Sequence, residues 1–201
     1  MKENQLKAKD FITTGIFSIL FVIIFFVCVT CMSFIPYTQP FGIALTALVA
    51  GPVYMIMRAK VAKTGGILLF GAVYAIVMFA TGGGWVIPAF TMIGALIAEV
   101  ISYAGKNISF KLNTVAYAVM MLAVAAGSYF PLLSMKEYYL SLAAGNGVDN
   151  GMMAELVSFI NLPFLLLAMA VTALCAVFGA LIARAMFKKH FIKAGIVKEV
   201  K

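Results

Sequence analysis

The chain has 201 residues, of which 64% are hydrophobic and 11% are charged, and its formal net charge is +8. A soluble domain usually carries about 25% charged residues, so this composition excludes an ordinary soluble domain and indicates an integral membrane protein. The three cysteines all lie inside apolar segments, which argues against a disulfide-rich secreted protein. We therefore predict a single all-α integral membrane domain covering residues 1–201.

Six segments are apolar and long enough to be membrane spans, since a helix needs roughly 20 apolar residues to cross about 30 Å of hydrocarbon. The first uncharged segment is longer than a signal-peptide core and lacks a small-residue cleavage site, so we expect it to stay in the mature protein as a span. The uncharged segment 65–98 is too long for one crossing, and Gly82, Gly83 and Gly84 favour a turn that divides it. The predicted spans cover about 11–35, 41–57, 65–81, 85–103, 112–133 and 156–183.

The basic residues are concentrated in the segments that six spans would leave on one side. Of the 15 Lys and Arg residues, all except Lys136 lie in the two tails or in segments 58–64 and 104–111. Because basic residues resist translocation, we predict cytoplasmic termini in a multi-pass protein of the prokaryotic cell membrane. Orientation alone accounts for this charge, so nucleic acid is not expected as a partner. Contact with anionic lipid or with a docking protein remains an alternative role for the basic face.

No motif for catalysis, metal binding or nucleotide binding is present. The string Lys63-Thr64-Gly65-Gly66 lacks the preceding glycine loop of a Walker A motif, and there is no HExxH sequence and no Ser/His/Asp set. His190 stands beside two lysines in the C-terminal tail, where we expect a solvated side chain. The sequence therefore predicts a protein that is not an enzyme and that carries no metal and no cofactor.

Among the carboxylates, Glu99 is unusual because it lies about 14 residues, or roughly 21 Å, into the fourth predicted span. An ionisable group at that depth is costly and is a functional candidate. We expect it to have a coupling role, or to pair with Lys106 or Lys111. Asp10 is expected to be the N-cap of the first helix. Glu155 is expected at the outer start of span six, as a cap or as a ligand contact.

Polar and aromatic residues also gather on the predicted outer side. Aromatic residues at a bilayer edge commonly form an interfacial belt, but aromatic walls with a few polar groups also suit a small-molecule pocket. The glycine-containing loop 134–153 is predicted to act as a lid over such a pocket. The candidate substrate-binding residues are Tyr37, Gln39, Thr81, Trp85, Tyr129, Glu155 and Asn161.

Small residues recur at every fourth position on several spans, which allows helices to approach closely. One set is Gly42, Thr46 and Ala50, and another is Ala168, Thr172, Ala176 and Ala180. Internal packing is the expected role of both sets. On the first span the small pair at this spacing is Thr14 and Ser18.

With these features the sequence resembles the Trep_Strep (MptD-like) family of substrate-binding S components of energy-coupling factor (ECF) transporters. The resemblance covers nearly the whole chain and rests mainly on GPVYMIMRAKVAKTGG at 51–66, with support from TGGGW at 81–85. It implies an S-component-like bundle that captures a small organic micronutrient at the outer face. It also implies partners, namely an ECF transmembrane coupling subunit and two cytoplasmic ATPases. A small-residue motif on the first helix faces the partner in such subunits, and the matching residues here are Thr14 and Ser18.

The basic residues Arg58, Lys60 and Lys63 complete the set of candidate partner-interface residues. The leading hypothesis is thus a transport subunit without its own ATPase motif. The alternative is a stand-alone secondary carrier or channel for a small molecule, in which Glu99 would couple the movement of protons. A third class, a polytopic membrane enzyme or assembly factor, has the least support in the sequence.

Overall fold

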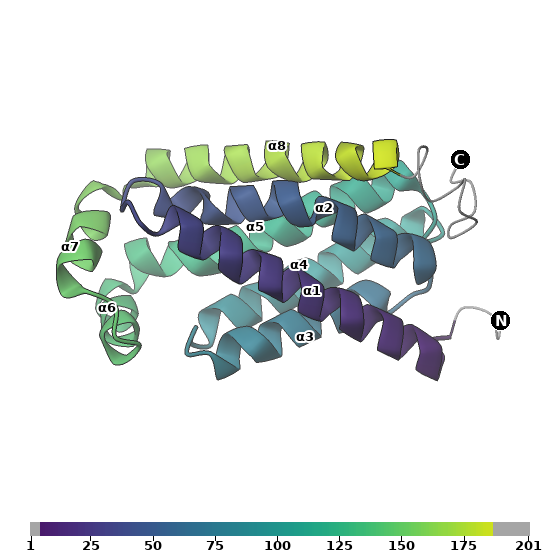
Figure 1. The fold of residues 1–201 in the computed structure, drawn as a ribbon, viewed down its shortest axis with the longest axis horizontal. Helices are drawn as coiled ribbons and strands as arrows, with labels where there is room; N and C mark the ends of the chain where they lie inside the picture. The colour runs from purple at the N-terminus through teal and green to yellow at the C-terminus, as the bar shows by residue number, and fades with distance from the viewer. Residues whose placement is uncertain (1–4, 187–201) are drawn as a thin grey trace.

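The computed structural model describes residues 5–186, which form a bundle of helices and contain no strand. Of the tails predicted to be cytoplasmic, residues 1–4 and 187–201, including His190, lie outside the described residues. The longer helices are α1 (Ala8–Met32), α2 (Gly42–Lys60), α3 (Gly66–Ala80), α4 (Val86–Ala104), α5 (Phe110–Ser134) and α8 (Leu162–Met186). They run along the length of the molecule, while α6 (Lys136–Gly145) and α7 (Asn150–Phe159) lie together at one end (Figure 1). A short 3-10 helix, η2 (Gln39–Phe41), leads into α2. The predicted all-α membrane fold is confirmed.

In the described residues, five helical segments are long and apolar enough to cross a membrane: α1, η2 with α2, α4, α5 and α8. The sixth predicted span corresponds to α3, an apolar helix of only 15 residues. At 1.5 Å per residue α3 is about 22 Å long, which is less than the ~30 Å thickness of the hydrocarbon core. It packs against α1 and α4. The predicted turn at Gly82–Gly84 separates α3 from α4.

The predicted boundaries of the last span and of the loop before it are wrong. The span was expected to begin at residue 156, but α7 ends at Phe159 and α8 begins at Leu162. The Asn161 side chain accepts a hydrogen bond from the Phe164 N–H at 3.0 Å, which stabilises a new helix start. Pro163 fits the first turn of α8, where its missing N–H has no helical partner to lose. The expected lid loop 134–153 is mostly helical and consists of α6 and the start of α7.

Helices α2 and α8 pack closely through small side chains. A Cβ atom on Gly51 would overlap the backbone of Gly179, and one on Gly179 would overlap the carbonyl oxygens of α2. Such contacts allow helices to associate in lipid, where apolar side chains alone provide little driving force. Both predicted sets of small residues are buried, so their expected role in internal packing is confirmed; they are Gly42, Thr46, Ala50, Ala168, Thr172, Ala176 and Ala180.

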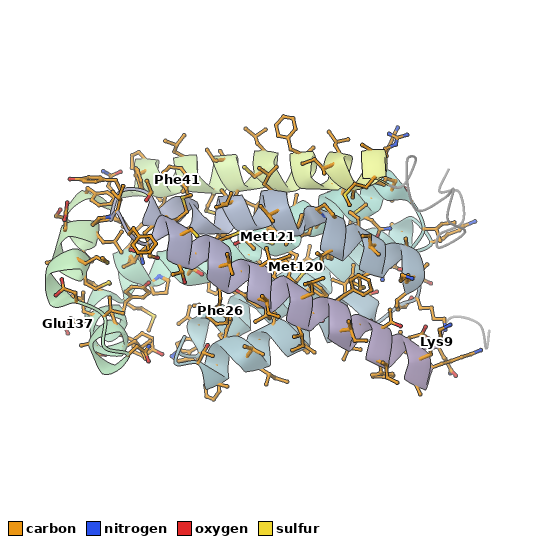
Figure 2. The ribbon with its side chains drawn as sticks, viewed as in Figure 1. Lys9, Phe26, Phe41, Met120, Met121 and Glu137 are labelled. Atoms are coloured by element: carbon orange, nitrogen blue, oxygen red, sulfur yellow. The ribbon has the colours of Figure 1, made fainter. Side chains whose placement is uncertain are left out.

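Aromatic and methionine side chains fill the middle of the bundle. The ring of Tyr54 on α2 stacks on Tyr117 of α5, with 4.7 Å between centroids, and meets Phe70 of α3 edge-on at 5.6 Å. Met120 and Met121 lie near the midpoint of the bundle (Figure 2) and are fully buried. The exposed faces of the long helices are instead apolar, as expected for surfaces that contact lipid; examples are Ile12, Ile16, Ile23, Ile93, Val100, Leu166, Leu174 and Phe178.

Charged residues are separated between the two ends of the bundle. Lys9 at the start of α1 and Glu137 on α6 lie at opposite ends (Figure 2). Within residues 5–186, Lys136 is the one Lys or Arg on the side of α6 and α7, and the other basic residues lie toward the opposite end. We call this opposite end, where α1 begins and α8 ends, the basic end, and we call α6 and α7 together the cap.

Candidate functional sites at the two ends of the bundle

The basic end contains a buried arginine. Arg58 lies in the last turn of α2, and its side chain is only 1% exposed. Its guanidinium donates to the Val61 carbonyl at 2.9 Å and to the Ser102 hydroxyl at 2.9 Å, which joins the end of α2 to α4. Longer bonds of 3.3–3.4 Å reach the Lys63 carbonyl, both oxygens of Asn107 and the Asn113 side chain. Because all its nitrogens are engaged, Arg58 is not available to a partner protein.

A second buried contact lies nearby, where the Glu99 carboxylate of α4 meets the first turn of α3. The Glu99 side chain is 5% exposed, and Oε2 accepts hydrogen bonds from the N–H groups of Ile67 at 2.9 Å and Leu68 at 3.1 Å. The N-cap of α3 is Gly65, which has no side chain to satisfy these amides. The first N–H groups of a helix lack internal partners, and its N-terminus carries a partial positive charge. A carboxylate from α4 therefore caps α3.

Two expectations for the carboxylates at this end need correction. Within residues 5–186, Glu99 makes no ion pair with Lys106 or Lys111, because its bonds go to the backbone of α3 instead. Asp10 is not the N-cap of α1: Lys7 has that position, and Asp10 is the third helical residue. The Asp10 carboxylate accepts the Lys7 N–H at 2.7 Å and forms an ion pair with Lys63 at 2.5 Å. Of the three predicted basic interface residues, only Lys60 is exposed.

The small pair on α1 also faces inward. Thr14 and Ser18 are fully buried, and the Ser18 hydroxyl donates to the Thr14 carbonyl at 2.8 Å. A docking stripe made of these two residues does not fit this structure. The exposed face of α1 consists of large apolar side chains, including Ile12, Ile16, Ile19 and Ile23.

At the end bearing the cap, the predicted substrate residues fall into separate groups. Tyr37 is exposed and stacks on Phe159 of α7, with 4.4 Å between ring centroids. The Tyr129 hydroxyl donates to the Pro40 carbonyl, beside Gln39 in η2. Asn161 caps α8, as described above. Glu155 is exposed in the middle of α7 and does not stand at the start of a span, contrary to prediction.

Thr81 and Trp85 form the other group. They lie at the turn between α3 and α4, and the cap contacts this turn. The Asn146 side chain donates to the Gly82 carbonyl at 3.0 Å, and the Trp85 N–H donates to the Tyr138 hydroxyl at 3.4 Å. Gly82 and Gly84 have φ angles of +85° and +68°, which favour glycine. Both side-chain partners belong to the helix and turn of α6. Sequence reasoning missed Asn146, because nothing in the sequence places it beside Gly82.

Several buried polar atoms have no hydrogen-bond partner within the described residues. Among them are the hydroxyls of Tyr74 and Thr91 and the Oε1 atom of Gln39. Thr91 of α4 packs beside Gly71 of α3, and Tyr74 lies three residues further along α3. The Tyr74 ring meets Phe21 and Phe25 of α1 edge-on, so Tyr74 is buried between α3 and α1, whereas Thr91 is buried at the α3–α4 contact. Leaving a buried polar group unpaired costs about 1–3 kcal/mol, so each of these two positions is suited to a ligand or water that supplies the missing bond.

Together, the lipid-facing exterior, the spans and the separation of charges define a polytopic helical membrane protein. The chain belongs to the Trep_Strep family, described as "Hypothetical bacterial integral membrane protein", whose family model matches residues 8–193. Membership of the Trep_Strep family and a location in a bacterial cell membrane, both predicted from the sequence, are confirmed. No curated protein and no solved structure matches the chain.

Proposed function

We propose that this protein is a membrane transport subunit that binds a small organic solute inside the bundle, beneath the cap. The observation that carries this proposal is the presence of unpaired hydroxyls, on Tyr74 and Thr91, in the interior of a membrane protein. Met120 is close to Thr91, because the Met120 terminal methyl and the Thr91 side chain are both near Gly71. Methionine adapts its shape to a bound molecule more readily than other apolar side chains.

The contacts of the cap also support a solute site. Two polar contacts, from Tyr138 and Asn146, connect α6 to the α3–α4 turn. Both are exposed or partly exposed bonds, whose net contribution is about 1 kcal/mol each. The cap also buries Ala143, Met153 and Leu156 in the apolar core, so it covers this end of the bundle, as a site that excludes water while it holds a solute requires.

The finer proposal is that the protein is the S component of an ECF-type importer. The chain has no nucleotide-binding motif, so an imported solute would need energy from a coupling subunit and two ATPases. For this role we propose a docking surface for the coupling subunit that differs from the one predicted from the sequence. The exposed apolar face of α1, together with Lys60 at the basic end, would replace the buried Thr14, Ser18 and Arg58.

The test of solute binding is gentle purification from the native membrane, followed by mass spectrometry of co-purifying small molecules. We expect a retained solute, and Thr91→Val and Tyr74→Phe should each lower its affinity about 5–10-fold, as one lost hydrogen bond would do. Thr46→Val is the matched control, because the Thr46 hydroxyl already bonds to the Gly42 carbonyl within α2. If Thr46→Val and Thr91→Val had equal effects, the proposed site would be wrong.

The same purification tests the partners, because an S component should co-purify with a coupling subunit and ATPases. The buried charges Arg58 and Glu99 favour a second candidate, a stand-alone carrier, since intramembrane charges often mark ion pathways. That candidate predicts solute uptake by the purified protein alone in liposomes, driven by a proton gradient and lost in Glu99→Gln. Uptake that needs added ATPases would exclude it.

A further inference from the structure

The surface at the basic end is hollowed beside the turn that joins α4 to α5. Tyr103, Ala104, Lys106 and Asn107 line this depression, whose volume is about 460 Å³. Tyr103 is 60% exposed and Lys106 is also exposed. The Asn107 side chain is buried and already bonded within the Arg58 network. The phenol of Tyr103 and the ammonium of Lys106 are therefore the polar groups that the depression offers to a ligand.

An exposed apolar stripe of α4 leads to this depression. Ile93, Leu96, Ile97 and Val100 follow the spacing i, i+3, i+4 and i+7, which places them on one face of the helix. Their exposed fractions lie between 48% and 69%. The stripe ends at Tyr103, one turn beyond Val100. A tyrosine in this position is typical of the boundary between hydrocarbon and head groups. The surface thus fits an amphiphile with chains along α4 and a head group at Lys106.

The charges around the depression determine the sign of the head group. The Lys106 ammonium has no ion pair or side-chain hydrogen bond in the part of the chain that the structure describes. The carboxylates of that part at the basic end, Asp10 and Glu99, are buried and hydrogen-bonded. The exposed carboxylates Glu137, Asp149 and Glu155 are on the other side, in or beside the cap.

We propose that the depression at Tyr103 and Lys106 is a binding site for an anionic phospholipid. Its phosphate would contact the Lys106 ammonium, and its acyl chains would cover the stripe from Ile93 to Val100. This proposal does not depend on the transported solute. It differs from general attraction to a basic surface because it assigns the lipid to one lysine and one helix face.

The proposal is tested by native mass spectrometry of purified, delipidated protein titrated with phosphatidylglycerol or phosphatidylcholine. Lys106→Gln should lower phosphatidylglycerol binding about five-fold, the effect expected for one lysine at a membrane surface. Lys106→Arg should retain binding. Lys60→Gln is the matched control, because Lys60 is an exposed lysine at the same end on α2. Each variant is first checked for a single symmetric gel-filtration peak and unchanged helicity.

Several outcomes would overturn the proposal. Equal losses in Lys106→Gln and Lys60→Gln would indicate diffuse charge attraction without a site. Equal binding of phosphatidylcholine would remove the role of head-group charge. Displacement of phosphatidylglycerol by millimolar inorganic phosphate would identify a site for a free anion instead of a lipid. If Lys106→Arg alone failed to fold, the Gln variant and the lipid comparison would still decide the question.

Discussion

Replacing Glu99 should disrupt the start of α3, and the size of the effect should depend on what replaces it. In Glu99→Ala, the N–H groups of Ile67 and Leu68 lose the carboxylate that accepts them at 2.9 and 3.1 Å. Hydrogen bonds to charged groups contribute about 1.5–3 kcal/mol each. The variant also removes the negative charge near the buried guanidinium of Arg58, although these two groups form no ion pair within residues 5–186.

In Glu99→Gln, the side-chain carbonyl still accepts from these amides, but the negative charge is lost. A charged group near a helix terminus contributes up to ~2 kcal/mol in a partly buried site. We therefore expect the free energy of unfolding to fall by about 1–2 kcal/mol in the Gln variant and, with both hydrogen bonds lost, by about 4 kcal/mol in the Ala variant.

The assay combines thermal unfolding in detergent with hydrogen exchange measured on peptides that contain residues 66–69. Exchange at Ile67 and Leu68 should accelerate strongly in Glu99→Ala and weakly in Glu99→Gln, while the start of α5 remains protected. Glu155→Ala is the control, because it removes an exposed carboxylate. Equal destabilisation by Gln and Ala, or unchanged exchange at these two amides, would refute the capping role.

Three further predictions concern other contacts. Arg58→Lys should lower the free energy of unfolding by about 3 kcal/mol, because lysine keeps the charge but cannot reach all the acceptors around the planar guanidinium. Thermal unfolding measures this change, and the control Lys60→Ala should change the free energy of unfolding by less than ~0.5 kcal/mol. Gly51→Leu should push α2 away from α8 and lower the free energy of unfolding by about 3 kcal/mol or more. Denaturant titration measures this change, and a variant as stable as the wild type would contradict the close packing of the two helices. Asn146→Ala should loosen α6 and increase acrylamide quenching of Trp85, the single tryptophan of the chain; unchanged quenching would show that this bond does not hold the cap.

Much of the fold could be predicted from hydrophobicity and charge alone. The turn at Gly82–Gly84 and the concentration of basic residues at one end both follow from local composition. The short helices of the cap were missed because Gly145, Gly147 and Gly151 make the segment around them resemble a loop, and because the apolar end of α7 resembles the start of a span. The break before α8 was placed too early, although Asn161 and Pro163 carry the signal for it.

The candidate sites were harder to predict, because they depend on which helix faces meet. Arg58, Lys60 and Lys63 look equivalent in the sequence, yet one is buried, one is exposed and one pairs with Asp10. Helical spacing shows which residues share a face, but it does not show whether that face meets lipid or protein. Thr14 and Ser18 illustrate this, since their spacing fits a docking motif and their side chains are buried. The sequence predicts that Glu99 lies inside a long apolar helix, as it does in α4, but it does not predict the partners of Glu99 on α3.

The short length of α3 has a consequence for the surrounding bilayer. This helix is about 8 Å shorter than a typical hydrocarbon core, and it exposes Ile76 and Phe79 near one end. Lipids beside it must thin locally, at a cost of a fraction of a kcal/mol per ångström, while lipids beside the longer α8 need not. The protein is therefore surrounded by a bilayer of uneven thickness, and the acyl-chain length of the host membrane should influence how readily it tilts.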